Sequence, residues 1–178
     1  MPNDLSVHDV FKICFRTTND STINWLQYRI LHRILPVKYY LKKIRITTSD
    51  CCTFCNDMPE TIKHVFATCK KIQPLWNALS ILIYEKCNKN VNFDVCNVLF
   101  GVYPLVWENR ILNFIILYTK QYIFLCLKQS KTPHFLGLLH YLNQRYKTEK
   151  YIYIQKSEID EFEKAWSPWI DFINHLAV

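Results

Sequence analysis

The stretch CCTFCNDMPETIKHVFATC, residues 51–69, decides how the rest of this chain is organised. Within it, Cys52 and Cys55 are separated by two residues, His64 follows after eight more, and Cys69 after a further four. Three thiols and one imidazole at this spacing are typical of a tetrahedral zinc site, because Zn²⁺ binds four nitrogen or sulfur ligands. Four protein ligands leave no open position to activate water. The sequence therefore predicts one structural zinc ion.

The segment between the two ligand pairs is expected to form a helix. We place its start at residues 59–61, with Asp57 as the cap and the proline at the first helical position. His64 then lies on this helix, but Cys69 follows five positions later, well off the histidine's face on a regular α-helix. The helix is therefore predicted to end or distort near Thr68, so that Cys69 can turn back towards the metal.

These cysteines allow two other interpretations. Cys51 is a rival ligand, but its spacing to Cys55 is Cys-x3-Cys, so we prefer Cys52 and leave Cys51 as a free thiol or a substitute ligand. A Cys-x2-Cys pair also occurs in thiol redox sites, where the spacing lowers a thiol pKa. The presence of His64 and Cys69 favours metal binding over redox chemistry.

The motif resembles a known family. The Cys-x2-Cys pair, the run ETIKHVF at 60–66, Cys69 and Trp76 are similar to the zinc-binding region that follows the polymerase of non-LTR (LINE-type) retrotransposon reverse transcriptases. The flanks look similar too, at Trp25, Arg29, Ile30, Phe100-Gly101, Leu112-Asn113, Lys120 and residues 164–169. The resemblance implies a non-catalytic segment that holds RNA and/or DNA, with the polymerase region of a parent polyprotein as a further partner.

Composition excludes several classes of protein. Half of the 178 residues are apolar, which is enough for a sizeable core, and two glycines are too few for a Gly-rich phosphate loop. Residues 1–9 lack a basic start and an apolar segment, so the eight cysteines are expected in a reducing, intracellular setting, nucleus or cytoplasm. The apolar run 111–127 is interrupted by polar residues and is expected to be a core helix, with no membrane as partner.

Charge is unevenly distributed along the chain, whose formal net charge is +7. Residues 29–71 hold nine Lys or Arg against three Asp or Glu, residues 110–156 hold eight against one, and residues 157–178 hold one against five. Two basic segments suggest binding to a polyanion. The candidate nucleic-acid-binding residues are Arg29, Arg33, Lys38, Lys42, Lys43, Arg45, Lys70 and Lys71, together with Trp25 and Tyr28.

The helix expected at about 22–35 has two distinct faces. One carries Ile23, Leu26, Ile30 and Ile34, and the other carries Trp25, Tyr28, Arg29, His32 and Arg33. Aromatic rings beside cations suit single strands or RNA. The alternative is that Trp25 and Tyr28 pack on a neighbouring helix while the arginines face water.

Apolar periodicity predicts an all-α protein, a zinc-stapled helical domain followed by a bundle of longer helices. We divide it into a helical zinc-binding region at 1–87, a linker with a short turn or strand at 88–104, and a helical region at 105–178. The other helices are expected at about 6–15, capped by Ser6, and at about 37–44, 74–87, 105–129 and 133–154, with the aromatic residues of the last two in the core. A final helix from Ser157 should be kinked or split by Pro168.

Catalytic chemistry is not expected, because the chain has no Asp-Asp pair that would hold metal ions for polymerisation. Two functions remain. In the first, the zinc holds a helical module whose basic face binds RNA or DNA. In the second, the same helices form a protein-interaction or scaffolding domain, and the charge only maintains solubility. The first requires Lys38, Lys42, Lys43, Arg45, Lys70 and Lys71 to share one surface.

Overall fold

The computed structural model describes residues 7–104 and 108–176, and within these ranges it is 69% helical and contains no strand. This confirms the prediction of an all-α fold. The elements follow one another as α1 (Val7–Thr17), α2 (Ser21–Leu31), α3 (Lys38–Lys43), the π-helical η1 (His64–Thr68), α4 (Gln73–Cys87), α5 (Val95–Phe100), α6 (Glu108–Lys128), α7 (Phe135–Gln155), α8 (Ile159–Trp166), the 3₁₀ turn η2 (Ser167–Trp169) and α9 (Ile170–Leu176).

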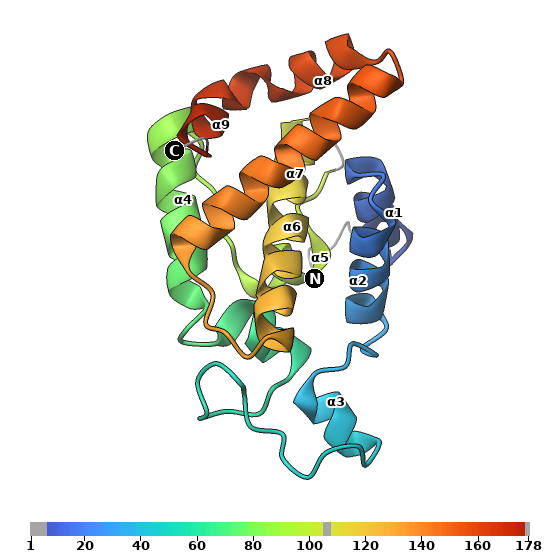
Figure 1. Ribbon diagram of the computed structural model, residues 1–178, viewed down its shortest axis with the longest axis vertical. Coiled ribbons are helices and arrows are strands. Elements are labelled where there is room, and N and C mark those ends of the chain that lie inside the picture. The colour runs from blue at the N-terminus through green and yellow to red at the C-terminus, as the bar shows by residue number, and fades with distance from the viewer. Residues whose placement is uncertain (1–6, 105–107, 177–178) are drawn as a thin grey trace.

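Helix α6 is the central element, and it contacts α1, α2, η1, α7 and α8 (Figure 1). Helices α1 and α2 lie on one side of it, α4 lies on the other, and α3 extends with the metal-site loop at one end of the molecule (Figure 1). The stretch Asn109–Lys128 is long and apolar enough to cross a membrane, but 72% of its most apolar window is buried inside the protein. It therefore packs as the core helix that the sequence predicts.

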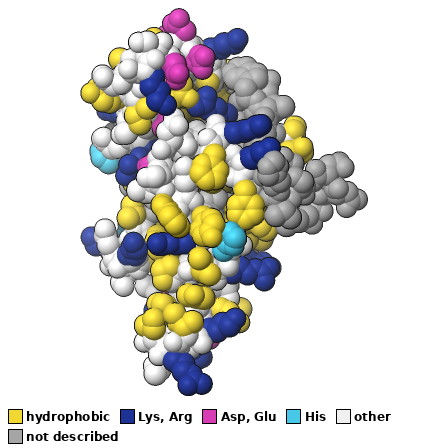
Figure 2. Space-filling model, turned by 90° about the vertical axis from the view of Figure 1, so that its right-hand side faces the viewer, with side chains coloured by type: hydrophobic (Ala, Val, Ile, Leu, Met, Phe, Trp, Pro, Cys, Tyr) yellow, Lys and Arg dark blue, Asp and Glu magenta, His cyan; other side chains and the backbone are white. Residues whose placement is uncertain are grey.

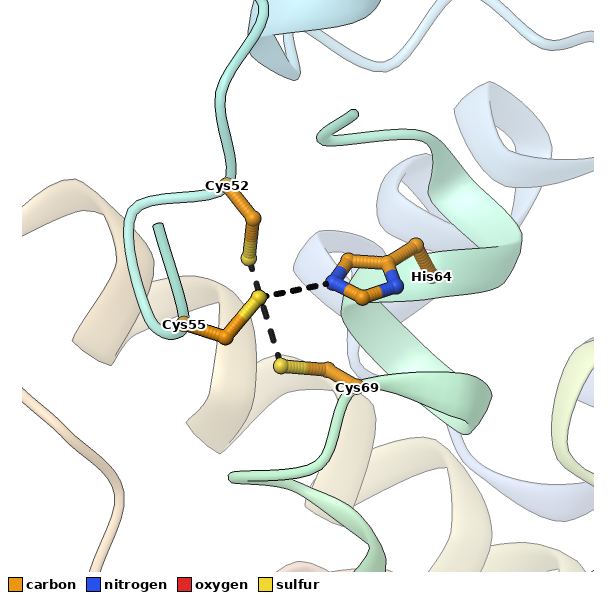
Figure 3. A group of neighbouring side chains, drawn as sticks. All are labelled: Cys52, Cys55, His64 and Cys69. Carbon is orange, nitrogen blue, oxygen red and sulfur yellow. Dashed lines mark hydrogen bonds between the residues drawn. The ribbon is translucent and has the colours of Figure 1, made fainter. Parts of the chain in front are cut away.

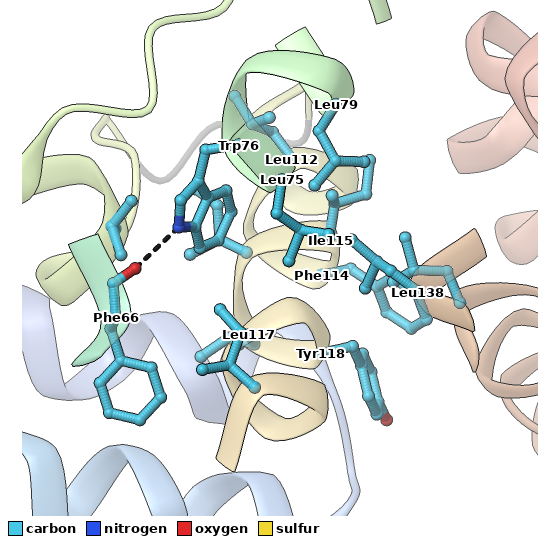
Figure 4. Packing of buried hydrophobic residues seen from close by; sticks show 14 of the residues in the cluster. Phe66, Leu75, Trp76, Leu79, Leu112, Phe114, Ile115, Leu117, Tyr118 and Leu138 are labelled. Atoms are coloured by element: carbon cyan, nitrogen blue, oxygen red, sulfur yellow. Dashed lines mark hydrogen bonds between the residues drawn. The ribbon is translucent and has the colours of Figure 1, made fainter. Parts of the chain in front are cut away.

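One cluster of buried side chains joins the first and last parts of the chain. It includes Phe66 beside the metal site, Leu75, Trp76 and Leu79 of α4, and residues of α6 and α7 such as Ile115 and Leu138 (Figure 4). Helix α4 confirms the helix predicted at about 74–87, and its buried residues, at helical spacing, are Leu75, Trp76, Leu79, Leu82 and Ile83. The aromatic side chains of α6 and α7 also pack in or against this cluster, except for the exposed Tyr151. The division into regions at 88–104 stays a prediction.

Helix α2 ends earlier than the sequence predicts, and Ile34 is correspondingly exposed while Leu35 is completely buried. The cause is Arg33, whose φ of 58° is left-handed. Its amide donates to the carbonyl of Ile30, and the amide of Ile34 donates to that of Arg29. This pattern is a Schellman motif, which usually has glycine at the left-handed position. The motif ends the helix before Pro36.

The sequence predicts a short turn or strand within 88–104, but residues 95–100 of this segment form helix α5. Asp94 caps this helix by accepting from the amide of Asn97 at 2.8 Å. Gly101 ends it with a φ of 88°. Pro168 also splits the last helix as predicted, with η2 between α8 and α9. The predicted cap Ser6 lies outside the described residues.

Candidate metal centre

The four predicted ligands come together in the folded chain. One ligand atom from each of Cys52, Cys55, His64 and Cys69 lies within 4.8 Å of all the others. The three sulfurs and the imidazole converge on a common point between the Cys52–Cys55 turn and the η1 helix (Figure 3). Cys52 and Cys69 are completely buried, and His64 is 7% exposed. Cys55 is half-buried, so three of the four ligands are shielded from water.

The distances between these atoms fit one zinc ion. The sulfurs of Cys52 and Cys69 are 4.0 Å apart, and the sulfur of Cys55 lies 3.3 Å from Nε2 of His64. A tetrahedral ion with Zn–S bonds of ~2.3 Å and a Zn–N bond of ~2.0 Å separates two sulfurs by about 3.8 Å and a sulfur from a nitrogen by about 3.5 Å. The donor set is therefore compatible with one structural zinc held by four protein ligands.

A local distortion of the helix brings Cys69 to the site. Residues 64–68 form a π-helix, and the amide of Cys69 donates to the carbonyl of His64, five residues back, at 2.9 Å. Cys69 itself is extended, with a ψ of 129°. The wider turn moves Cys69 towards the face that carries His64, where a regular α-helix would leave it ~140° away. The predicted distortion near Thr68 is confirmed.

The start of this helix differs from the prediction. The helix begins at Ile62, and its cap is Thr61, whose hydroxyl accepts from the amide of His64 at 3.1 Å. Pro59 instead forms an isolated β-bridge with Cys51, and Asp57 pairs with Lys70. The bridge closes residues 51–59 into a loop. Pro59 belongs to this bridge and Asp57 to an ion pair, so neither takes part in the start of the helix. Thr61, the next residue with a hydroxyl, therefore caps the helix.

The bridge also separates the two adjacent cysteines. Cys51 is exposed and takes part in the backbone bridge, whereas Cys52 is buried among the other ligand atoms. Because neighbouring side chains in an extended segment point in opposite directions, Cys51 cannot share the position of Cys52 in this conformation. The structure thus favours the Cys-x2-Cys pair that the sequence motif suggests.

The three thiols have different acidities. Burial raises the pKa of Cys52 to about 12 and also raises the pKa of Cys69. Burial acts in the same direction on Cys55, but the backbone amides of Met58 and Asp57 and the ring of His64 outweigh it and lower its pKa to about 6. Cys55 therefore presents a thiolate near neutral pH, and zinc must displace the protons of the other two thiols.

Glu60 is a further structural residue of this site, and its role was not predicted. Its side chain is 2% exposed. One carboxylate oxygen accepts from the amide of Lys38 at 2.9 Å, and the other accepts from the amide and hydroxyl of Thr53 at 2.7 and 2.6 Å. The carboxylate thus binds the N-terminus of α3 to the Cys52–Cys55 turn. No local sequence signal indicates these partners, because Lys38 is 22 residues away.

The comparisons with known proteins agree with this geometry. Residues 2–76 match zf-RVT, the family model for zinc-binding in reverse transcriptase. The matched zf-RVT segment contains all four ligands and ends at Trp76, whose side chain is buried. The match confirms the resemblance of this region to the zinc-binding part of reverse transcriptases. No curated protein matches the chain.

The predicted basic residues are distributed around the zf-RVT segment, and all are exposed except Lys38, which is half-buried. Lys42 pairs with Asp50 and Lys70 pairs with Asp57, each at 2.9 Å. Arg33 and Lys43 line a groove of about 800 Å³ between α1, α2, α3, α5 and residues 61–63. Lys38, Lys42, Arg45, Lys70 and Lys71 do not line it. Of the six basic residues that were predicted to share one surface, only Lys43 therefore lines this groove.

Lys63 is not among the predicted binding residues, although it is one of the nine basic residues of 29–71. Lys63 is exposed, precedes the ligand His64 and lines the same groove as Arg33 and Lys43. Among the described residues that form the groove, none is acidic. The face that includes α2 and α3 shows hydrophobic side chains interspersed with Lys and Arg, while most of its acidic side chains lie near the opposite end (Figure 2).

Trp25 and Tyr28 are surface residues. Trp25 is 61% exposed and Tyr28 is 43% exposed, although the rest of α2 is packed against α1, α5 and α6. The alternative in which both pack on a neighbouring helix is therefore wrong. Their rings contact each other edge to face, with centroids 5.6 Å apart. The aromatic face predicted for this helix is thus open to a partner.

Proposed function

We propose that this chain is a non-catalytic, zinc-stabilised nucleic-acid-binding segment of a LINE-type reverse transcriptase. The match of residues 2–76 to a zinc-binding, non-catalytic region of reverse transcriptases supports the origin of this segment in such an enzyme. Nucleic-acid binding by this segment rests on the groove that Arg33, Lys43 and Lys63 line. A concave surface whose described lining has three cations and no acidic side chain attracts phosphate groups, because the positive potential of its walls adds up.

The zinc has a clear structural role in this proposal. One wall of the groove consists of Tyr39, Tyr40 and Lys43 of α3, and another consists of residues 61–63, which lead into the metal-binding helix. Zinc fixes that helix to the Cys52–Cys55 turn, and Glu60 fixes the turn to α3. Removal of the metal should therefore open the groove. Loss of nucleic-acid binding on chelation follows from the same contacts.

A salt titration tests the proposal directly. The variant Arg33→Gly, Lys43→Gln, Lys63→Gln removes three cations, and Arg33→Gly suits the left-handed backbone at that position. The control Lys86→Gln, Lys131→Gln, Lys147→Gln makes the same change in net charge at three exposed lysines outside the groove. Filter binding with RNA and DNA at several salt concentrations gives affinity and salt slope for each protein.

Each phosphate contact contributes about 0.9 to the log–log salt slope on duplex DNA and about 0.7 on single strands. We expect the groove variant to bind more weakly than the control and to flatten the slope by about two. Weaker binding by the control than by the groove variant would move the contact to the basic segment 110–156, to which Lys131 and Lys147 belong. Equal binding by the two variants would show that the groove is not the contact. Failure of the wild-type protein to bind either nucleic acid would favour the protein-interaction function.

A further inference from the structure

A continuous row of aromatic rings leads along α2 into the basic groove. The ring of Trp25 contacts Tyr28, Tyr28 contacts His32 with centroids 4.1 Å apart, and His32 contacts Phe11 of α1 at 5.4 Å. His32 and Phe11 are themselves part of the groove lining. The four residues, called the ring row below, therefore connect an open helix face with the interior of the groove.

Cations lie along the ring row. The guanidinium of Arg29 lies 5.9 Å from the ring centroid of Trp25, and Arg33 follows His32 at the groove. Both arginines are exposed. Exposed ring faces next to cations form the kind of surface on which successive bases stack while their phosphates are neutralised.

We infer that the ring row and the groove together form a binding track for single-stranded nucleic acid. The inference rests on the proposed function and specifies its ligand. Unpaired bases stack on the outer faces of Trp25 and Tyr28, and the strand continues past His32 and Phe11 into the groove. A duplex cannot use these contacts, because its base faces are already stacked within the helix.

The groove has the size and chemistry for an unpaired base. Its volume of about 800 Å³ is within the usual ~300–1,000 Å³ of sites that enclose a small organic ligand. Apolar side chains such as Ile34, Val37 and Ile62 line it, and the three cations of the proposed function lie among them. A flat aromatic base suits the apolar lining, and its phosphates suit the cations. A protein partner would have to supply acidic groups instead.

Ring variants test the track. Trp25→Ala and Tyr28→Ala each remove an exposed ring, so both are expected to leave folding intact, and Trp25→Phe retains a stacking face. Tyr84→Ala and Tyr151→Ala are matched controls, since these rings are 58% and 61% exposed and lie outside the row. Binding is measured with single-stranded RNA, single-stranded DNA and duplex DNA of equal length at one salt concentration, and thermal melting checks each fold.

We expect Trp25→Ala and Tyr28→Ala each to weaken single-strand binding about 5- to 150-fold with an unchanged salt slope, while the controls and Trp25→Phe stay much closer to wild type. Duplex binding should be weaker and indifferent to the rings. Single-strand affinity that survives both alanine variants, but falls in the groove charge variant, would overturn the track and leave the proposed function standing. A wild-type preference for duplex would also overturn it. Absence of any nucleic-acid binding would overturn both.

Discussion

The indole nitrogen of Trp76 donates a hydrogen bond to the backbone carbonyl of Phe66 at 2.7 Å. Both residues are buried, at 3% and 0% exposure, and Phe93 packs on the indole at 5.0 Å. The carbonyl would accept from residue 70 in a regular α-helix, but the metal-binding helix has already ended at Thr68. The indole of Trp76 supplies the hydrogen bond to the Phe66 carbonyl instead. This bond joins the metal centre to α4 and hence to the core (Figure 4).

Trp76→Phe should destabilise the protein, because it leaves the Phe66 carbonyl buried without a donor. The expected loss is about 1–3 kcal/mol in the free energy of unfolding. The same substitution at the exposed Trp25 should change stability by less than ~0.5 kcal/mol. Urea unfolding of both variants measures the difference. Equal effects at the two positions would show that the hydrogen bond contributes nothing.

Zinc removal should loosen residues 44–76, because binding free energy at a structural site is also folding free energy. Free zinc at ~1,000 times its Kd adds about 4 kcal/mol to stability. We expect about one zinc per chain by metal analysis and a lower unfolding midpoint after chelation. His64→Ala should lose the metal, whereas His140→Ala, at an exposed histidine, should retain it. Zinc-free reduced protein with wild-type stability would contradict the site.

The two adjacent cysteines should respond differently to substitution. Cys52→Ser should lose zinc, because Cys52 is buried with the other ligands, and Cys51→Ser should retain it, because Cys51 is exposed on the β-bridge. Chelator competition gives the zinc affinity of each variant. The reverse result would show that residues 51–55 adopt another register when metal is bound.

Lys120 should make stability depend on pH. Its side chain is 1% exposed, its ammonium donates to the Gln27 side chain, and burial lowers its pKa to about 7 against the weaker opposing effect of Cys14. In the unfolded chain the pKa of this lysine is ~10.4. Between pH 7 and this value the unfolded chain therefore binds more protons than the folded protein. The contribution of Lys120 to the free energy of unfolding thus increases with pH over this range, by up to ~1.4 kcal/mol per pH unit.

Lys120→Met removes this dependence and keeps the other titrating groups, so the difference between wild type and variant isolates the lysine. Urea unfolding at pH 7 and pH 9 with saturating zinc measures it. The variant's advantage should be largest at pH 7 and should shrink towards pH 9. A constant difference between the two proteins at both values would mean that Lys120 stays charged in the fold.

Replacement of Ser130 by glycine should stabilise the protein. Ser130 ends α6 with a φ of 53°, and the amide of Lys131 donates to the carbonyl of Cys126 as in a Schellman motif. A non-glycine residue in the left-handed region of backbone conformation destabilises the fold by ~1–2 kcal/mol. Glycine avoids this penalty but loses more backbone entropy on folding, so the net gain is smaller. Ser130→Gly should therefore stabilise the fold by roughly 0.5–1 kcal/mol. Ser130→Ala retains the penalty and serves as the control in thermal unfolding, where an equal gain would refute the explanation.

Short-range patterns determined the metal ligands and most helices. The spacing of Cys52, Cys55, His64 and Cys69 predicted which atoms meet, because turns and helices fix geometry over a few residues. The same reasoning predicted the distortion near Thr68 and the apolar face of α4. These features depend on neighbours in the chain, so the sequence alone contains the information.

Tertiary structure decided which residues meet across long separations. Asp57 resembles a cap in the sequence, yet its pairing with Lys70 and the Cys51–Pro59 bridge leave that role to Thr61. Arg33 and Lys63 are thirty positions apart and share a groove only after α3 folds back beside the metal-binding helix. Patterns of hydrophobicity and charge describe each segment separately. Which segments pack together depends on the shared burial of their side chains, and that is a property of the whole chain.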